Sequence, residues 1–392
     1  MTISRAQQVD LAATPYYHLV SRCVRRAFLC GRDPHSGRDY GHRKRWLVER
    51  LRELGDVFAV EVCAYAVMSN HYHVVLRVVA EAAAGWSADE VVERYGRLFK
   101  NVAGQLEGLT DEQRDERLEL WRERLTSISW LMRTLNEYLA RRANKEDGCT
   151  GRFWEGRFKS QALLDEAALL TCMSYVDLNP VRAGAAPRLD DAEHTSIRER
   201  LAAMGTRLDA AEAELASESD APESGSPSDA AEVELSAEAP GEDGQAATAA
   251  TGRRGAGAGR EAAPAKSALE TEVGWHRLVP FADEPNRTGS EALPMTLVDY
   301  AELLDWTGRA HREGMARLSG PRPQLLQRRG IDPEAWLRMT MAGPGFEHLA
   351  AFGTEANLKE RAARTDRAWC KGQRVARRLF SAEVEQASFA AA

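Results

Sequence analysis

Apolar and polar positions follow regular periods along the N-terminal half of the chain, and these periods predict its secondary structure. Runs with strand character cover 17–24, 59–67, 72–78 and 157–164, and helical spacing covers 43–54 and 128–144. The order strand, helix, strand, strand, helix, strand predicts an α+β fold with a ferredoxin-like antiparallel sheet. We expect its helices to lie on one face, leaving the other face open to a polymer.

A further helix is predicted over 165–180. Its first turn is acidic, an apolar stripe follows at helical spacing, and Pro180 is expected to end it. Tyr175 and Asn179 are four residues apart and therefore share a helix face. A phenol and an amide would then be directed to the same place, although Tyr175 could equally pack as an ordinary aromatic residue and Asn179 could be a helix cap.

Two histidines occupy the predicted strand 72–78 and its entrance. His71 and His73 flank Tyr72, so they project from one face about 7 Å apart, while Tyr72 faces the other side. That separation suits one metal ion, although strands also carry such pairs by chance. A neutral phenol attacks a phosphate only when the phosphate is strongly polarised, and a divalent cation held by His71, His73 and Asn179 would polarise it.

Three separated motifs resemble a known family. Met-Ser-Asn-His-Tyr-His at 68–73 is followed by Gly-Arg-Phe-Trp-Glu-Gly-Arg-Phe-Lys-Ser at 151–160 and Tyr-Val-Asp-Leu-Asn-Pro-Val-Arg-Ala-Gly at 175–184. In this order they resemble the HUH single-tyrosine transposases, in particular the REP-associated tyrosine transposases. The resemblance spans about residues 14 to 200, which is roughly half of the chain.

The resemblance implies an HUH nuclease core and a reaction. Tyr175 would be the nucleophile, and His71, His73 and Asn179 would hold Mg²⁺ or Mn²⁺; insertion-sequence members have glutamine at the position of Asn179. The implied activity is nicking and strand transfer on single-stranded DNA, near a hairpin, through a 5′-phosphotyrosine. Two other functions stay open: a domesticated regulator that binds hairpin DNA, and a noncatalytic nucleic-acid-binding module. Both a monomer and a homodimer are compatible with the sequence.

Basic and aromatic residues are interleaved between 152 and 159, a composition typical of contacts to phosphates and unpaired bases. The predicted DNA-binding residues are Arg22, Arg152, Trp154, Arg157 and Lys159. Trp154 is equally compatible with a place in the core.

The net charge of −7 is unevenly distributed. Residues 1–200 hold 30 Lys and Arg against 29 Asp and Glu, whereas the remaining residues hold 22 against 30. The acidic excess therefore lies outside the region with the motifs and does not argue against a nucleic-acid partner there.

Composition predicts three regions: a nuclease domain over 1–204, a flexible acidic linker over 205–270, and a mainly helical C-terminal domain over 271–392. An inserted helical arm is expected at about 82–126. In the C-terminal part we expect helices over 297–308, with Thr296 as N-cap and Gly308 as terminator, and near 333–341, 346–352 and 366–380.

Six cysteines without paired CxxC spacing indicate reduced thiols and no disulfide framework. The sequence contains no signal-peptide pattern and no apolar run of about 18 residues. We therefore expect a cytoplasmic protein that is associated with the nucleoid when it binds DNA.

Overall fold

The computed structural model describes residues 8–24, 30–32, 37–219, 278–284, 291–313, 321–342 and 349–380. The chain forms two compact units, one of residues 1–204 with 274–392 and one of residues 205–273. The C-terminal residues thus share a unit with the N-terminal ones, whereas the sequence predicts a separate domain. Helix α9 (Ser196–Ser219) covers the start of the predicted linker, and the rest of that linker lies outside the described residues.

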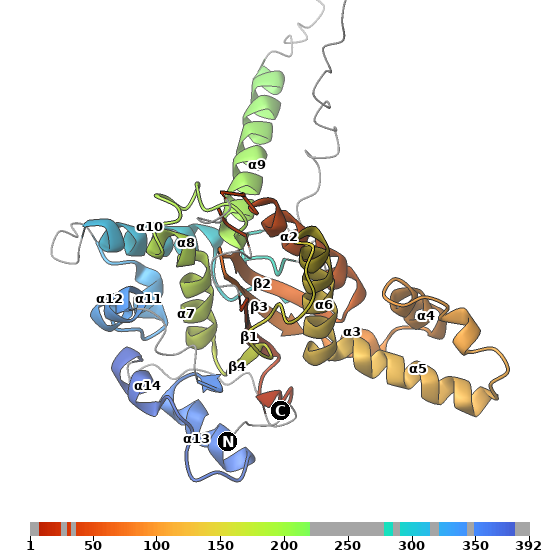
Figure 1. Ribbon diagram of the computed structural model, residues 1–392. Helices are drawn as coiled ribbons and strands as arrows, with labels where there is room; N and C mark the ends of the chain where they lie inside the picture. Colours follow the sequence, from red (N-terminus) through yellow and green to blue (C-terminus); the bar gives the residue numbers. More distant parts are fainter. Residues whose placement is uncertain are drawn as a thin grey trace, which may run out of the picture. The chain divides into compact units, whose positions relative to one another are not determined.

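A five-stranded mixed sheet forms the centre of the first unit (Figure 1). The strands are β1 (Tyr16–Arg22), β2 (Val60–Val67), β3 (His71–Val78), β4 (Lys159–Leu163) and β5 (Ala351–Phe352). Their order is β2-β3-β1-β4-β5; neighbours among the first four are antiparallel, and β5 runs parallel to β4. The four predicted strands are confirmed, and the fold is α+β.

Helices α2 (His42–Val57) and α6 (Ile128–Glu146) cover one face of the sheet. Tyr72 projects from this face and donates a 2.8 Å hydrogen bond to Asn136 of α6, which in turn donates to Ser21 of β1. The buried Arg43 of α2 pairs with Glu146 and Asp147 at the end of α6. These contacts fix both helices over the strands that carry the histidine motif.

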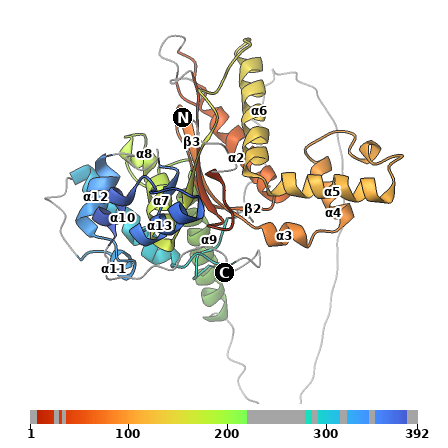
Figure 2. The ribbon, with the colours of Figure 1, turned by 90° about the horizontal axis from the view of Figure 1, so that it is seen from below.

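Helices α7 (Glu166–Asp177) and α8 (Asn179–Arg182) lie on the opposite face (Figure 2). The expectation of helices on one face only is therefore wrong. Both β2 and β3 are buried along nearly their whole length, at odd and at even positions. Their almost continuous apolar sequences are typical of strands with both faces covered.

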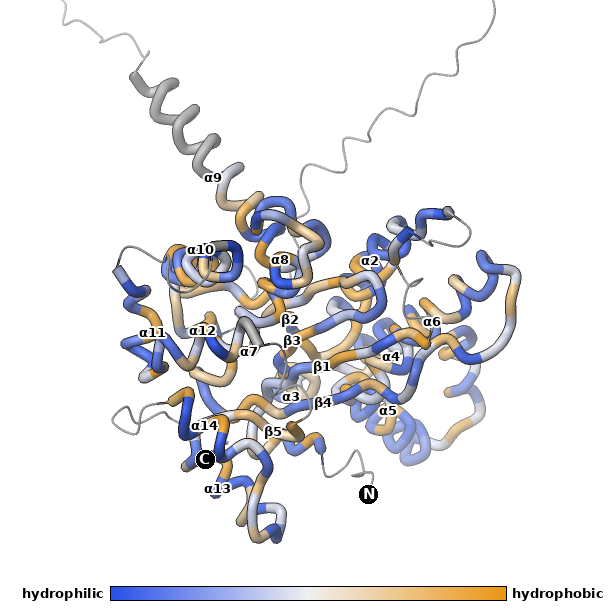
Figure 3. The backbone as a smooth tube through the Cα atoms, turned by 60° about the vertical axis from the view of Figure 1, so that its left-hand side comes forward, coloured by the Kyte–Doolittle hydropathy of each residue, from blue (hydrophilic) through white to orange (hydrophobic). Residues whose placement is uncertain are grey.

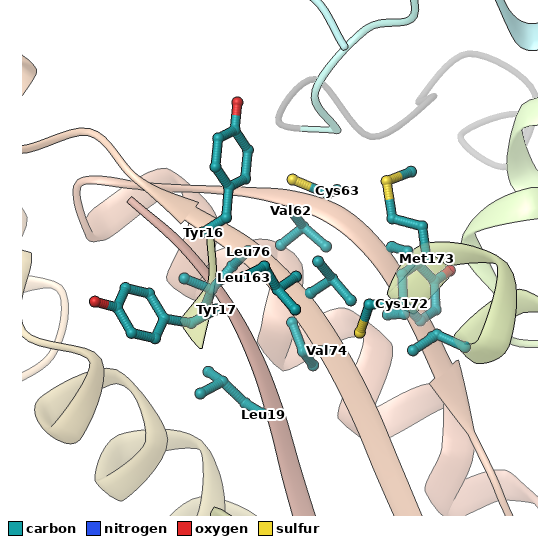
Figure 4. Close-up of a cluster of buried hydrophobic side chains, with 14 of the residues drawn as sticks. Tyr16, Tyr17, Leu19, Val62, Cys63, Val74, Leu76, Leu163, Cys172 and Met173 are labelled. Carbon is teal, nitrogen blue, oxygen red and sulfur yellow. The ribbon is translucent and has the colours of Figure 1, made fainter. Parts of the chain in front are cut away.

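The hydrophobic core lies between the sheet and these helices. Figure 4 shows Val62, Val74 and Leu76 of the strands with Cys172 and Met173 of α7, all of them buried. In Figure 3 the central strands are coloured mainly as apolar, whereas the outer helices alternate between apolar and polar. Burial of these side chains provides the main stabilisation of the sheet and of α7.

The predicted arm is a helical projection between β3 and α6 (Figure 1). It consists of α3 (Ala80–Ala84), α4 (Ala88–Gly96), the 3₁₀ turn η1 (Ala103–Gln105) and α5 (Asp111–Thr126). Trp121 is buried and stacks on Tyr95 with ring centroids 4.7 Å apart. The arm thus has its own small apolar cluster.

The described C-terminal residues form α10 (Leu297–Glu313), α11 (Gln324–Arg328), α12 (Pro333–Ala342), α13 (Glu355–Arg364) and α14 (Gln373–Leu379). Thr296 caps α10 as predicted, but the helix continues past Gly308, which retains an ordinary helical backbone. The helices expected over 346–352 and 366–380 are partly wrong: 346–348 is outside the described residues, Ala351–Phe352 is strand β5, and only Gln373–Leu379 of the last segment is helical. Among the described residues, no helix combines the length and apolar character needed to cross a membrane.

Candidate active site

His71 and His73 project from β3 toward α7 and α8, and these helices carry Tyr175 and Asn179. Nε2 of His73 lies 3.0 Å from Nδ2 of Asn179, and the rings of His73 and Tyr175 meet edge to face with centroids 5.7 Å apart. The two histidine rings are 4.8 Å apart. The structure therefore brings all four predicted residues together from elements about a hundred positions apart in the chain.

The backbone around Pro180 directs Asn179 to His73. Helix α7 ends at Asp177, and Leu178 keeps helical dihedral angles of −80° and −8°, so α8 follows almost without interruption. Pro180 lies in the first turn of α8, where the missing N–H would have no helical partner. The side chain of Asn179 therefore turns inward and is 2% exposed.

His18 of β1 is a further member of the cluster that sequence reasoning missed. Its Nε2 lies 2.9 Å from Nδ1 of His73, and the two rings stack with centroids 5.2 Å apart. Both rings are buried, and the side chain of Gln161 on β4 hydrogen-bonds to His18. A polar residue in the middle of an apolar strand was the available signal, because His18 shares a sheet face with His71 and His73.

Arg182 is the second residue that was missed. Its Nη2 donates to the Tyr175 hydroxyl at 3.0 Å and to Oδ1 of Asn179 at 3.3 Å. The guanidinium carbon lies 4.8 Å from the centre of the Tyr175 ring. Tyr175, Asn179 and Arg182 follow one another at helical spacing, and this periodicity could have identified the arginine.

All three histidines are neutral at pH 7. Burial lowers the pKa of His18 to about 4 and that of His73 well below its ordinary value. Burial, then the charges of Arg22 and Arg182, lower the pKa of His71 to about 4. A neutral imidazole has one nitrogen with a free lone pair, which is the form that binds metals.

The donor set consists of two imidazoles and one amide oxygen. Imidazole suits transition metals, and Mg²⁺ prefers oxygen, so these donors fit Mn²⁺ better than Mg²⁺. Nδ2 of Asn179, rather than Oδ1, faces His73, and rotating the amide by half a turn exchanges these atoms. The donors fit a cation after that rotation, which also ends the contact of Oδ1 with Arg182. Among the described residues, no group of three or more His, Cys, Asp or Glu is arranged to bind a metal.

The predicted DNA-binding residues divide into two groups. Arg22 is exposed and opposite His71 in the β1–β3 ladder, and the exposed Lys159 begins β4 opposite Val20. Both charges reach His71, since both lower its pKa. These two cations therefore border the cluster.

The remaining predicted residues lie in the segment before β4. Trp154 is half-buried, donates from Nε1 to the carbonyl of Asn136, and packs against Tyr72, so it is on the face of the sheet opposite to the histidines. Arg152 and Arg157 are exposed, and Arg152 donates to the carbonyl of Trp154. The structure does not bring Trp154 into the histidine cluster.

The class that these observations define is an α+β protein with a buried cluster of histidine, tyrosine, asparagine and arginine. No protein-family model matches the chain, and no curated protein matches it. A solved structure of a REP-associated tyrosine transposase bound to a REP hairpin is similar over 48% of this chain and 79% of its own, with 12% identity and a TM-score of 0.30. Two chains with so low a TM-score cannot be said to share a fold, so function is argued below from this chain's own residues.

Proposed function

We propose that this protein is a transposase-like, metal-dependent endonuclease and strand transferase that cuts single-stranded DNA near hairpins through a 5′-phosphotyrosine at Tyr175. Its core would be a ferredoxin-like sheet of the HUH type. The observation that carries the proposal is the convergence of His71, His73 and Asn179 on the tyrosine, with His73 3.0 Å from Asn179. Buried polar groups in such number serve chemistry more often than they serve stability.

In the proposed reaction the phenolic oxygen of Tyr175 attacks a backbone phosphorus. A Tyr175 O–P bond forms and the P–O3′ bond breaks; the phenol proton passes to solvent, and the departing oxygen takes up a proton as a free 3′-hydroxyl. A bound divalent cation would polarise the phosphate and stabilise the developing charge. Attack by a 3′-hydroxyl on the phosphotyrosine reverses the step and joins a strand.

His71, His73 and Asn179 would hold the cation. Arg182 positions the nucleophile, because it donates to the Tyr175 hydroxyl at 3.0 Å. Its charge favours the phenolate as the proton leaves, and it also attracts the incoming phosphate. One side chain thus orients the attacking oxygen and balances the charge that accumulates around it.

The strand would enter beside His71. Tyr175 and Asn179 are each 2% exposed, whereas His71 and Arg182 are half-buried and Arg22 and Lys159 are exposed. Cations at this border would bind the phosphates on either side of the cut. Attack requires Arg182 to move aside with the phosphate, because the hydroxyl is otherwise covered.

All of the proposed ligands and the nucleophile come from one chain, so we propose that a monomer is competent. A mixture of Tyr175→Phe and His71→Ala proteins tests this point, since neither contains a complete site. We expect no covalent product from the mixture. Product formation would indicate that tyrosine helices are exchanged between subunits of a homodimer.

A second candidate is hairpin binding without cleavage, as in a domesticated regulator. The burial of the Tyr175 hydroxyl beneath Arg182 favours this alternative. It predicts the same DNA affinity but no covalent product under any condition.

The deciding experiment uses a hairpin oligonucleotide with single-stranded flanks and a 3′ label, because a 5′-phosphotyrosine retains the 3′ fragment. Incubation with Mn²⁺ or Mg²⁺ should give a labelled band that survives denaturation. Tyr175→Phe should abolish the band and preserve DNA binding, whereas Tyr138→Phe, a matched change on α6, should leave both unchanged. Binding without a band would favour the regulator, and a band from Tyr175→Phe would refute the assignment of the nucleophile.

A further inference from the structure

Trp369 is 60% exposed, on the segment between α13 and α14. The other large apolar side chains exposed among the described residues are aliphatic, namely Leu11, Val24, Leu120 and Val298. An indole in water costs hydrophobic free energy that burial would recover, so its position calls for an explanation in binding.

A pocket of about 440 Å³ lies beside this indole. Its lining is formed by Ala350 and Ala351 at the outer strand β5 and by the residues Arg367, Ala368, Trp369, Cys370 and Lys371. The segment is anchored at both ends, since the amide of Arg367 donates to the carbonyl of Ala362 and Gly372 turns with a φ of 114° into α14. The pocket therefore has small apolar walls, one aromatic face and a cation on each side.

The segment is strongly basic in a chain with a net charge of −7. Between residues 364 and 378 there are six Lys or Arg and one acidic residue, Asp366. Arg364 and Arg377 pair with Glu360 and Glu355, whereas Arg367, Lys371 and Arg374 are exposed beside Trp369. Positive charge is thus concentrated on both sides of the indole.

We propose that this surface, the Trp369 pocket, binds single-stranded DNA. An unpaired base stacks on the indole and enters the pocket, while Arg367 and Lys371 contact the flanking phosphates. An aromatic face with a cation on either side matches the alternation of base and phosphate, whereas an acidic peptide would use the cations and leave the indole without a stacking partner. The choice of DNA as the polymer rests on the proposed function; the site itself is separate from the tyrosine cluster.

The test measures binding of a short labelled oligothymidylate to the full chain by fluorescence anisotropy. Trp369→Ala should weaken binding by about 5- to 100-fold, because stacking on an aromatic residue contributes that much per base. Trp369→Phe should restore most of the affinity. Leu120→Ala, an exposed apolar change on α5, is the matched control and should leave the affinity unchanged.

Charge is tested separately through salt dependence. Arg367→Ala with Lys371→Ala should lower the slope of log affinity against log salt by about 1.4, or about 0.7 per lost phosphate contact on a single strand. The control Arg338→Ala changes an exposed arginine of α12 and should leave the slope unchanged. A photoreactive base in the oligonucleotide should crosslink to the peptide that contains Trp369.

The outcomes separate this inference from the proposed reaction. Wild-type affinity in Trp369→Ala overturns the pocket, whatever the cleavage assay shows. Displacement of an acidic peptide by these substitutions, with DNA binding unaffected, also overturns it and identifies a protein-binding surface. Conversely, weakened DNA binding in Trp369→Ala supports the pocket even if no phosphotyrosine forms, and Tyr175→Phe should bind the oligonucleotide as the wild type does.

Discussion

Asp177, the last residue of α7, accepts a 2.7 Å hydrogen bond from the hydroxyl of Tyr300 on α10. Its other oxygen accepts from the hydroxyl of Ser196 at 2.6 Å and from the amide of Ile197 at 3.1 Å. Asp177 and Tyr300 are both buried. The end of the tyrosine helix next to Asn179 is therefore held by residues from far along the chain.

The other end of α7 is held in the same way. Asp165 caps the helix by accepting from the amide of Ala168 at 2.8 Å, and its second oxygen accepts from the amide of Thr354 and the side chain of Asn357. The C-terminal residues thus fix both ends of the helix that carries Tyr175. Their described role is to hold the candidate nucleophile against the histidines of its own chain.

Tyr300→Phe should destabilise the protein by about 1–3 kcal/mol, because it leaves one oxygen of a buried carboxylate without its donor. The pKa of Asp177, which burial raises to about 6, should rise further when this donor is lost. Urea denaturation measures the free energy of unfolding, and hydrogen exchange should show faster exchange at the C-terminal turn of α7.

Tyr138→Phe is the matched control for this change. The Tyr138 hydroxyl accepts from Arg142 on the exposed side of α6, where the loss of a hydrogen bond costs little. Equal effects of the two substitutions on stability, or unchanged exchange in α7 for Tyr300→Phe, would contradict the role of Tyr300 as a clamp.

Asp165 gives a pH-dependent prediction. Burial raises the pKa of this carboxyl above its ordinary value of 3.8, although its hydrogen bonds lower it. The folded state then binds the proton more tightly than the unfolded state, so the free energy of unfolding falls as pH rises from about 4 through the raised pKa. Asp165→Asn cannot ionise and should lack this decrease, gaining stability relative to the wild type as pH increases.

The measurement is a set of urea denaturation curves at pH values between about 3.5 and 7 for both proteins. Loss of one acceptor to Thr354 and Asn357 gives Asp165→Asn a constant offset, so the informative quantity is the change of the difference with pH. A difference that stays constant over this range would show that Asp165 is ionised with an ordinary pKa.

The strands and helices around the histidine motif could be predicted from the sequence because each has a clear period. Strand β3, predicted over 72–78, spans His71–Val78, and α6, predicted over 128–144, spans Ile128–Glu146. Strand β5 could not be predicted, because two residues have no period and this strand forms only by pairing with β4. The covered second face was indicated by the continuous apolar runs but was not inferred from them.

The candidate site was predictable only as far as local spacing reached. His71 with His73, and Tyr175 with Asn179, are related by the periods of a strand and a helix. His18 and Arg182 join the cluster through strand pairing and through the turn after Pro180, and neither is visible in a local pattern. Trp154 has the composition of a DNA-binding segment, yet its indole donates to the backbone of α6.

His18 should act as a positioning residue for His73. The two imidazoles share one proton between Nε2 of His18 and Nδ1 of His73, which are 2.9 Å apart. When His73 donates this proton, its Nε2 retains the lone pair on the side of Asn179, where the proposed cation would bind. His18 would thereby select the tautomer of His73 that can act as a ligand.

His18→Phe should therefore lower the affinity for Mn²⁺ by about 10- to 100-fold in calorimetric titrations, as expected when a ligand loses its supporting hydrogen bond. It should also cost about 1–3 kcal/mol of stability, because Nδ1 of His73 is left buried without a partner. His18→Gln, which can still accept from Nδ1, should recover part of both losses. His42→Phe removes a partly exposed histidine on α2 and serves as the control.

A purely structural His18 would affect stability alone, so the decisive readout is the tautomer of His73. Nitrogen chemical shifts of the metal-free protein report which ring nitrogen carries the proton. We expect protonation at Nδ1 in the wild type and a shift of the proton toward Nε2 in His18→Phe, where Nδ1 has lost its acceptor. An unchanged tautomer together with unchanged Mn²⁺ affinity would leave His18 as a core residue, because neither the proton position nor the ligand nitrogen would then depend on it.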